Sequence, residues 1–558
     1  MRHTKSIIGL AAALFVAAGF YGCNGNDDQS GNAPAAPAAP AAPGTPATPD
    51  APKPPPAAEV TGKWTTGDLH VHTIESDDAQ SPLTAVLDKA FTVNNLDWTA
   101  LTNHLRPSTR DHEGNPIAGG AVPYSKAMAT YEVPVVKQLQ ADGRYAGKLI
   151  FSGFEWDMPT HDHVNVGIFG GAPLAPVLKA ASEFEYFFTN RPDTQFDPVD
   201  VAAWNAKGPR KFNTHADAMA AFAWLKDNYP DTSYAFINHP SRGMPLKYTA
   251  ADYREINDTA PNIAFAVEGM VGNQMEPDRG GFNTAYIPAN VKARTYGGVD
   301  YVVAQVGGMW DALLGDGRRF WNVASSDHHF KTIGANSSGY FPGEYAKNYV
   351  WLENSNTGIK AVLEGLRSGK AFAVFGDLIN ALDFNAAAGA TKREMGGELK
   401  AKAGETVTVT IRFKSPDRNN YEYPLDSGVN VNARPTVDHI DLIAGDVTPR
   451  AAAGTPGYNK ETNDSTKVIA TFTKADWKLD KDGYNTVTYT YTASKSQYFR
   501  LRGTNLGMNV PGETANGNPL ADDRTSVTED VARFNTINAR NYNDLWFYSN
   551  PVFVTVGS

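Results

Sequence analysis

Short apolar, β-rich runs alternate with longer segments of helical periodicity between residue 64 and about residue 384, and this alternation constrains the fold most. After the first run, the others are DWTALTNH (97–104), KLIFSGFEW (148–156), YAFINHP (234–240), NIAFAVEGM (262–270) and FWNVASSDHH (320–329). Amphipathic helices are expected between them, for example over 82–95, 216–229 and 357–368. This order predicts parallel strands, and a parallel set of this length closes most readily into a barrel. The carboxyl ends of barrel strands meet at one face, where a site is expected.

The first run, WTTGDLHVHTIESDD (64–78), carries His70 and His72 at its outgoing end, and Asp77 follows on the loop. Side chains alternate along a strand, so the two imidazoles lie on the same face. Imidazole nitrogen and carboxylate oxygen are common ligands of divalent metals. Taken alone, the two histidines are better explained as a surface pair. Their recurrence in later runs favours a metal site instead.

Similar residues stand where the later runs end. They are His104; Glu155 with His161 and His163; His239; and Asp327 with His328 and His329. With His112, on the loop after His104, nine of the twelve histidines belong to this series. Random placement would rarely put them after β-rich runs, so the series predicts a metal cluster.

The same motifs resemble those of the PHP (polymerase and histidinol phosphatase) domain. DLHVHTIESD is similar to the first motif, DLHxHTxxSD, and LTNH to the second, TDH; GFEWDMPTHDHVNV, INHP and SSDHH are similar to the later ones, in family order. The likeness covers about residues 64–384. It implies an α/β fold with a distorted barrel of the (β/α)7 type over residues 61–385, and a metal-dependent phosphoesterase. The N-terminal segment, which has the features of an export signal, and the β-rich C-terminal part look most like the CehA/McbA-type branch of this family.

Carried over position by position, the likeness implies two or three divalent ions, of Zn, Mn or Fe. One ion would be held by His70, His72, Glu155 and Asp327, a second by Asp77, His104 and His329, and a third by Glu155, His163 and His239. Glu155 would bridge. Two metals of this kind hold a hydroxide that attacks phosphorus, with His163, His239 or a metal assisting the leaving group.

Three nearby residues leave alternatives open. Arg242 is a candidate phosphate clamp because a guanidinium binds two oxygens at once, although a surface arginine explains it equally well. Glu268 is expected to support the ligands from behind. Asn103 replaces the Asp of TDH, which removes a charge beside His104 and leaves the affinity of the second metal open. The extra His161 and His328 are acid/base residues or, as we favour, polar loop residues.

After about residue 385 the pattern changes to alternating strands separated by turn residues. They include GETVTVTIRFK (404–414), VDHIDLIAGDV (437–447), KVIATFTKADW (467–477), NTVTYTYTAS (485–494), SQYFRLRGTN (496–505) and SNPVFVTVG (549–557). Few helices are expected between them, so residues 386–558 are predicted to form an antiparallel, all-β sandwich. Its only histidine is His439, so the chemistry is expected elsewhere.

The N-terminal segment predicts export. Residues 1–23 have a basic start, an apolar run and no acidic residue, as in a signal peptide, and the apolar run is short for a membrane span. FYGC, ending in Cys23, resembles a lipoprotein box, so Cys23 is expected to be lipidated; the alternative is a soluble exported protein. Residues 24–60 are rich in Pro and Ala, which predicts an extended, disordered linker. The expected location is the bacterial periplasm or cell surface, with an outer-membrane lipid anchor.

Composition excludes several classes of function. Cys23 is the only cysteine, which excludes an intramolecular disulfide, thiolate catalysis and cysteine-rich zinc sites. The net charge of −10 argues against a nucleic-acid partner, so a small molecule is expected, with membrane contact only through the lipid anchor. The sequence leaves the oligomeric state open.

The leading hypothesis is therefore an exported metal-dependent phosphoesterase acting on phosphate mono- or diesters. The second is a metallohydrolase of carboxylic esters, carbamates or amides, because the same hydroxide can attack carbon. The third is a glycan- or peptide-binding lipoprotein with a relic barrel. Cationic residues at the pocket favour phosphate, whereas an apolar rim, with the insertion over 170–211 as a lid, favours aryl esters or carbamates.

Overall fold

The computed structural model describes residues 61–243, 245–272, 279–282, 287–331, 339–419 and 434–557. The expected signal peptide over 1–23 and the linker over 24–60 lie outside these residues. Among the helices of the described part, none has both the length and the apolar character needed to cross a bilayer.

One sheet begins with the strand that leads to His70. Strands β1 (Gly62–Asp68), β2 (Trp98–Leu101) and β3 (Leu149–Ser152) pair in parallel, and β12 (Ala346–Glu353) pairs antiparallel with the other edge of β1. Strand β13 (Ala371–Phe375) pairs antiparallel with β12. These three parallel strands lie in runs that the sequence predicted to be strands. The helical segments between them provide the crossovers that parallel pairing requires.

A second sheet has the order β11–β8–β7–β5–β4. Its strands are β4 (Phe154–Asp157), β5 (His163–Gly170), β7 (Ser233–Ile237), β8 (Ala266–Met270) and β11 (Trp321–Ala324). Isolated parallel bridges connect the ends of the two sheets, Val71 with His328 and His104 with Glu155. The first bridge contains His328, and the second contains His104 and Glu155; all three belong to the series of residues that the sequence places at the ends of β-rich runs.

Strand β5 departs from the parallel order expected from the sequence. It pairs antiparallel with both β4 and β7, whereas β7–β8 and β8–β11 are parallel. Only residues 158–162 separate β4 from β5, and a parallel crossover needs about a dozen residues or more. The short connection therefore forces a hairpin, which places His163 beside the end of β4.

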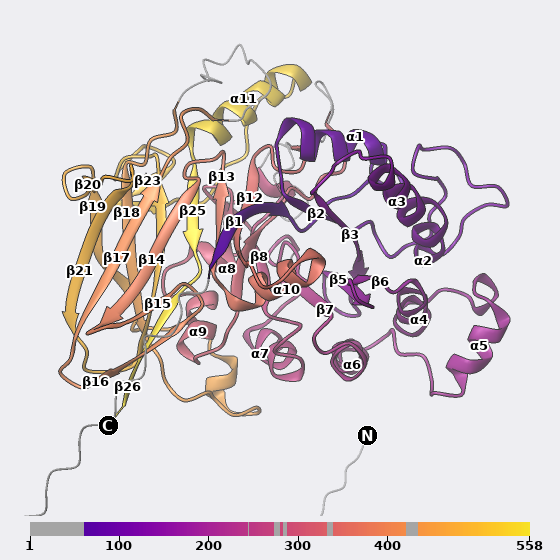
Figure 1. Cartoon of the computed structure of the whole chain (residues 1–558), viewed down its shortest axis with the longest axis horizontal. Helices are drawn as coiled ribbons and strands as arrows, with labels where there is room; N and C mark the ends of the chain where they lie inside the picture. The colour runs from indigo at the N-terminus through magenta and orange to yellow at the C-terminus, as the bar shows by residue number, and fades with distance from the viewer. Residues whose placement is uncertain are drawn as a thin grey trace, which may run out of the picture. The chain divides into compact units, whose positions relative to one another are not determined.

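Helices cover the strands of these sheets. Figure 1 shows α1 (Leu83–Asp88), α3 (Val133–Ala141), α4 (Leu178–Phe188), α6 (His215–Asn228) and α7 (Ala250–Thr259) in an arc around β1 to β8. Their buried apolar faces, such as Phe184 on α4 and Phe222 on α6, pack into the core. The sequence predicted the positions of α6 and of α10 (Gly358–Ser368) to within about a residue.

Apart from β23 (Thr514–Ala515) and β24 (Asn518–Pro519), which pair only with each other, the C-terminal strands divide between two sheets. One antiparallel sheet has the order β15–β14–β17–β21–β20 and contains β14 (Ala381–Ala388), β15 (Thr391–Glu394), β17 (Thr406–Lys414), β20 (Lys478–Leu479) and β21 (Asn485–Thr492). The others join the sheet of β1: they are β16 (Glu398–Lys402), β18 (His439–Asp446), β19 (Lys467–Thr473), β22 (Gln497–Thr504), β25 (Trp546–Ser549) and β26 (Val552–Gly557). The connection is the antiparallel pairing of β13 with β25. One sheet thus runs across the predicted boundary at residues 385 and 386.

A buried ion pair also crosses that boundary. Asp311, on α9 (Met309–Gly315), accepts two hydrogen bonds of 2.7 Å from Nε and Nη2 of Arg500 on β22. Both side chains are fully buried. Tyr498 Oη and the Gly307 amide donate further bonds to the same carboxylate, at 2.9 and 2.7 Å. The pair is therefore fully hydrogen-bonded on the Asp311 side.

We expect Asp311→Ala to lower the free energy of unfolding by about 3–5 kcal/mol, because it leaves the Arg500 guanidinium buried without its counter-charge. The matched control is Asp88→Ala, which removes a half-exposed partner of Arg144 and is expected to change stability by about 0–1 kcal/mol. Denaturant unfolding followed by circular dichroism measures both. Equal effects would show that the Asp311–Arg500 pair contributes nothing beyond a surface pair.

Candidate metal centre

Glu155 lies at the centre of the histidine cluster. It sits on β4 with only 1% of its side chain exposed. Five ring nitrogens lie within 3.3 Å of its two carboxylate oxygens, from His70 (3.3 Å), His72 (3.3 Å), His104 (2.9 Å), His163 (2.9 Å) and His239 (3.2 Å). Asn238 Nδ2 donates a 2.7 Å hydrogen bond to Oε1. The structure thus brings together residues that lie on, or just beyond, the five strands β1, β2, β4, β5 and β7.

Asp327 forms a second carboxylate of the cluster. Its Oδ1 lies 3.2 Å from His70 Nε2, 3.4 Å from His72 Nε2 and 3.5 Å from His329 Nδ1. Its Oδ2 accepts a 2.8 Å hydrogen bond from Arg242 Nη2. A side chain at Gly272 would collide with the Cβ of Asp327 at 2.1 Å, so only glycine allows this approach of the two segments.

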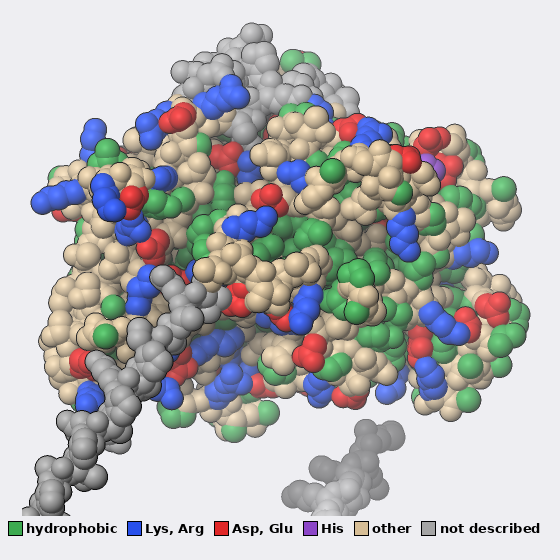
Figure 2. All heavy atoms as spheres, viewed as in Figure 1, with side chains coloured by type: hydrophobic (Ala, Val, Ile, Leu, Met, Phe, Trp, Pro, Cys, Tyr) green, Lys and Arg blue, Asp and Glu red, His purple; other side chains and the backbone are tan. Residues whose placement is uncertain are grey.

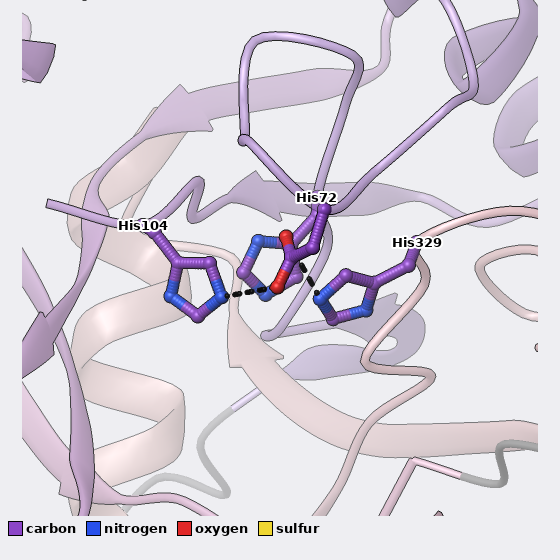
Figure 3. Close-up of side chains that lie close together, drawn as sticks. His72, His104 and His329 are labelled. Atoms are coloured by element: carbon purple, nitrogen blue, oxygen red, sulfur yellow. Dashed lines mark hydrogen bonds and ion pairs between the residues drawn. The ribbon is translucent and has the colours of Figure 1, made fainter. Parts of the chain in front are cut away.

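The third carboxylate is Asp78, whereas the sequence pointed to Asp77. Asp78 Oδ2 lies 3.1 Å from His104 Nε2, and its Oδ1 lies 3.4 Å from His329 Nε2. His104 and His329 thus both contact this carboxylate, and Figure 3 shows their two rings with His72 close by. The side chain of Asp77 is 52% exposed and faces Arg106 at 3.7 Å. A loop residue has no strand periodicity to fix its direction, so the sequence could not separate these adjacent aspartates.

The backbone places these side chains at the points where strands end. Beyond β1, the His72 amide donates to the His328 carbonyl at 2.9 Å, which ties the His-x-His segment to the segment that follows β11. His239 and Asp327 have positive φ angles of 25° and 45°. Residues other than glycine adopt this region uncommonly, and such strain is concentrated at functional sites.

Residues behind the cluster orient the rings. The Glu268 carboxylate accepts from His70 Nδ1 at 3.3 Å, from the His239 amide at 2.7 Å, and from Ser325 Oγ. Because a carboxylate accepts, Glu268 holds a proton on His70 Nδ1, and Nε2, which faces Glu155 and Asp327, is the atom available to a metal ion. This is the supporting position expected for Glu268.

Asn103 belongs to the same supporting layer. Its Oδ1 accepts from the Thr73 amide at 2.7 Å and from Ser76 Oγ at 3.1 Å, and its Nδ2 donates to Glu132 at 3.0 Å. Ser76 Oγ in turn lies 2.9 Å from His72 Nδ1. Asn103 therefore orients His72 through Ser76, and its amide donates to the buried Glu132, which an aspartate could not do.

Burial and neighbouring charges shift the pKa values of the cluster's histidines in opposite directions. Burial lowers the pKa of His72 to about 4, and the His329 ring adds to this effect. Burial also acts to lower the pKa of His104, but Glu155 and Asp78 outweigh it and raise that pKa to about 9. For His163, Glu155 and Asp157 outweigh burial and raise the pKa to about 10. The carboxylates thus stabilise positive charge on the ring nitrogens, a role that a bound cation would take over.

A cavity of about 340 Å³ opens beside the cluster. It is lined by Asp78, His104, Arg106, Glu155, His163, His239, Arg242, Asp327, His329, Phe330 and Gly339. Arg106 was not identified from the sequence. Its position two residues after His104, a predicted metal ligand, could have indicated that it lies near the site. The insertion over 170–211 contributes no residue to this lining; its helix α4 packs into the core. Two guanidinium groups and a single large apolar side chain therefore border the described part of the cavity.

The remaining histidines have other surroundings. His328 is fully buried, stacks on Phe341, and bonds Ser81 Oγ and the Tyr340 carbonyl, both at 3.0 Å. His112 is paired with Glu113 at 3.9 Å, and His439 with Asp438 at 2.9 Å. His161 faces Asp252 on α7. The polar-loop interpretation of His328 thus agrees with its contacts.

The donor set fits divalent metal ions. His70 Nε2 and His72 Nε2 lie only 3.0 Å apart. A metal ion bound by both nitrogens would account for this close approach of the two rings. The neighbouring ligand atoms include those of His72, Asp78, His104 and His329 in one group and His70, His72 and Glu155 in another. Imidazole and carboxylate ligands suit Zn, Mn and Fe.

Comparisons with known proteins give limited likenesses. The sequence matches no model of a known protein family and no curated protein. Among solved structures, a two-domain protein from Bacteroides vulgatus containing a predicted PHP-like metal-dependent phosphoesterase is 13% identical, with a TM-score of 0.30, over 84% of this chain and 96% of that one. PsfC from Pseudomonas syringae is 14% identical, with a TM-score of 0.28, over 54% and 88%. TM-scores this low leave the site itself as the basis for any conclusion on function.

Proposed function

We propose that this protein is a metal-dependent hydrolase, and specifically a phosphoesterase that acts on phosphate mono- or diesters. One observation carries the proposal: a largely buried cluster of six histidines and three carboxylates borders a cavity that also exposes Arg106 and Arg242. The cations favour a phosphate ester over an uncharged ester or carbamate, because a guanidinium pairs with two phosphate oxygens.

Two or three divalent ions would be held by His70, His72, Glu155 and Asp327, by Asp78, His104 and His329, and by Glu155, His163 and His239. When bound, such ions supply Lewis acidity, which activates water and neutralises phosphate oxygens. Arg242, fixed by Asp327, is placed to hold a phosphate oxygen. The buried His239 Nδ1 makes no hydrogen bond within the described part and lies 3.9 Å from Asp162 Oδ1, so it is our candidate for exchanging a proton with the leaving group. Both nitrogens of His163 face carboxylates, which fix its orientation.

For the fold we propose a distorted barrel of the PHP type, followed by a β-sandwich. The barrel interpretation is supported by the two isolated bridges between the sheets and by the continuation of β3 into β4 across Gly153. The sandwich interpretation is supported by the two groups of C-terminal strands, which pair antiparallel except for β16 with β26 and share one buried core.

We also propose that the protein is exported and anchored by a lipid at Cys23, and that its partner is a small phosphate ester rather than nucleic acid. The pattern of residues 1–60 supports the first proposal. For the second, the net charge is −10, and Figure 2 shows basic and acidic side chains interspersed over one face of the molecule.

The experiment that tests the function is elemental analysis of the purified protein beside a substrate panel of an aryl phosphate, a bis-aryl phosphate, an aryl ester and an aryl carbamate. We expect turnover of at least one phosphate. We also expect His70→Ala and Asp327→Ala to abolish activity and to remove metal, because each deletes a ligand atom. Turnover of only the ester or carbamate would refute the phosphoesterase, and a metal-free protein would support the binding-lipoprotein alternative.

His112→Ala is the control for these variants, since it also removes an imidazole from the same part of the chain. Its side chain is 21% exposed and pairs only loosely with Glu113. Metal content and activity are expected to match the wild type. Thermal unfolding of every variant separates loss of ligand from loss of fold.

The adjacent aspartates give a matched test of the ligand set. Asp78→Asn is expected to remove about one equivalent of metal, because it neutralises the carboxylate between His104 and His329. Asp77→Asn, an identical change one residue earlier, is expected to leave metal content unchanged. Elemental analysis after dialysis measures both, and loss of metal from the Asp77 variant alone would restore Asp77 as the ligand.

Arg242→Ala tests the preference for phosphate. The loss of a charged hydrogen bond of about 1.5–3 kcal/mol predicts a fall in kcat/KM for the aryl phosphate of roughly 10- to 100-fold. The aryl ester has no phosphate charge, so its kcat/KM should change much less. Arg144→Ala, at an exposed pair with Asp88, is the control. A uniform loss on all substrates would show instead that Arg242 only positions Asp327.

A further inference from the structure

A second group of metal-ligating side chains lies outside the centre described above. It consists of His161 on the loop between β4 and β5, His215 at the first position of α6, and Asp252 in the first turn of α7. The two imidazole rings lie 5.1 Å apart. All three residues are partly buried, so they border solvent without being freely mobile.

Hydrogen bonds fix which nitrogen of each ring carries its proton. His161 Nδ1 lies 2.9 Å from the Pro159 carbonyl, and a carbonyl can only accept, so Nδ1 is protonated and Nε2 presents a lone pair. His215 Nε2 lies 3.0 Å from the Glu255 carboxylate, so Nε2 is protonated and Nδ1 presents a lone pair. Both lone pairs face Asp252.

Asp252 offers one oxygen to this space. Its Oδ2 is used by the cap of α7, where it accepts from the Thr249 amide at 2.6 Å and from Thr249 Oγ1 at 2.7 Å. Its Oδ1 lies 3.6 Å from His161 Nε2 and 3.8 Å from His215 Nδ1. The helix cap therefore holds the carboxylate with its second oxygen turned toward the two rings.

Two ring nitrogens and one carboxylate oxygen converge here, with separations of 3.6 and 3.8 Å from Asp252 Oδ1 to the two nitrogens. A direct ion pair would bring the atoms to about 2.7–2.9 Å. The observed separations are closer to the roughly 3.3 Å between two ligands that each lie about 2.0 Å from a tetrahedral zinc ion. The geometry is thus that of ligands around a shared cation rather than that of paired side chains.

We propose that His161 Nε2, His215 Nδ1 and Asp252 Oδ1 form a separate Zn²⁺ site, with its fourth position open to water. Two imidazoles and a carboxylate are a ligand set that zinc accepts. The bonds of the opposite ring nitrogens to Pro159 and Glu255 are the supports that metal-bound histidines usually have. The ion would tie the loop that carries His161, and that leads into His163 on β5, to the starts of α6 and α7. This site does not depend on the proposed phosphoesterase activity.

The test is a zinc count on the full-length protein after loading with Zn²⁺ and removal of excess by dialysis. Four proteins are compared: wild type, His215→Ala, Asp327→Ala and the double variant. His215→Ala is expected to lose one equivalent relative to wild type. Asp327→Ala is expected to lose zinc from the main centre only, and the double variant to lose both. Equal zinc in the wild type and His215→Ala overturns the proposal, whereas equal zinc in the wild type and Asp327→Ala counts against the main centre alone.

Asp252→Asn provides a second variant that keeps an oxygen for the cap of α7 while removing the ligand charge. It is expected to weaken zinc binding by at least tenfold in a chelator competition carried out in the Asp327→Ala background. Cobalt loading in that background gives an independent signature, since tetrahedral Co²⁺ absorbs visible light, and the Asp327→Ala/His215→Ala double variant should absorb less than Asp327→Ala. Equal absorption in these two variants would overturn the proposal. Thermal unfolding without added metal, with His112→Ala as control, checks that the variants fold.

Discussion

Glu155 is a carboxylate with 1% of its surface exposed, and an ionised group in such a position costs several kcal/mol unless charges and hydrogen bonds compensate it. Here the compensation comes from five imidazoles and the Asn238 amide, contributed by segments from residue 70 to residue 239. A shift of any one strand end would leave part of that charge unpaired. The burial of a single carboxylate therefore couples the strands of two sheets, and a site with this requirement is assembled as a unit.

Two residues of the cluster have strained backbone conformations. His239 and Asp327 both adopt positive φ angles, a conformation that costs about 1–3 kcal/mol for such residues. Glu268 offsets the strain at His239 by accepting from its amide, and Arg242 holds Asp327 through its carboxylate. Both strained residues point their side chains into the cluster, so the strain accompanies the convergence of ligands. Supporting residues such as Glu268 and Ser76 are thus as necessary to the geometry as the ligands themselves.

The parts of this structure that follow from local pattern could be predicted from the sequence, and those that follow from distant pairing could not. The runs ending in His70, His104 and Glu155 are strands, and their ends meet, because periodicity and strand direction are local properties. Residue 78 rather than 77 enters the cluster because of loop geometry, which periodicity does not encode. The pairing of β13 with β25 joins residues about 175 positions apart, such as Ala373 and Tyr548, so no sequence window contains it. The antiparallel direction of β5 was available in principle from its short connection to β4.

The C-terminal part bears directly on the position of the site. Asn550 Oδ1 accepts a 2.9 Å hydrogen bond from the Asn322 amide on β11, the strand that leads to Asp327. Helix α11 (Asp530–Asn543) contributes Asn538, whose Oδ1 accepts from Tyr340 Oη at 2.6 Å, and Tyr340 in turn holds His328 through its carbonyl. Because His328 bridges to Val71 between the two histidines of the first run, these bonds connect the last strands of the chain to the first ligands. The β-rich region therefore acts on the centre through the backbone of the ligand-bearing segments, although His439, its own histidine, lies outside the cluster.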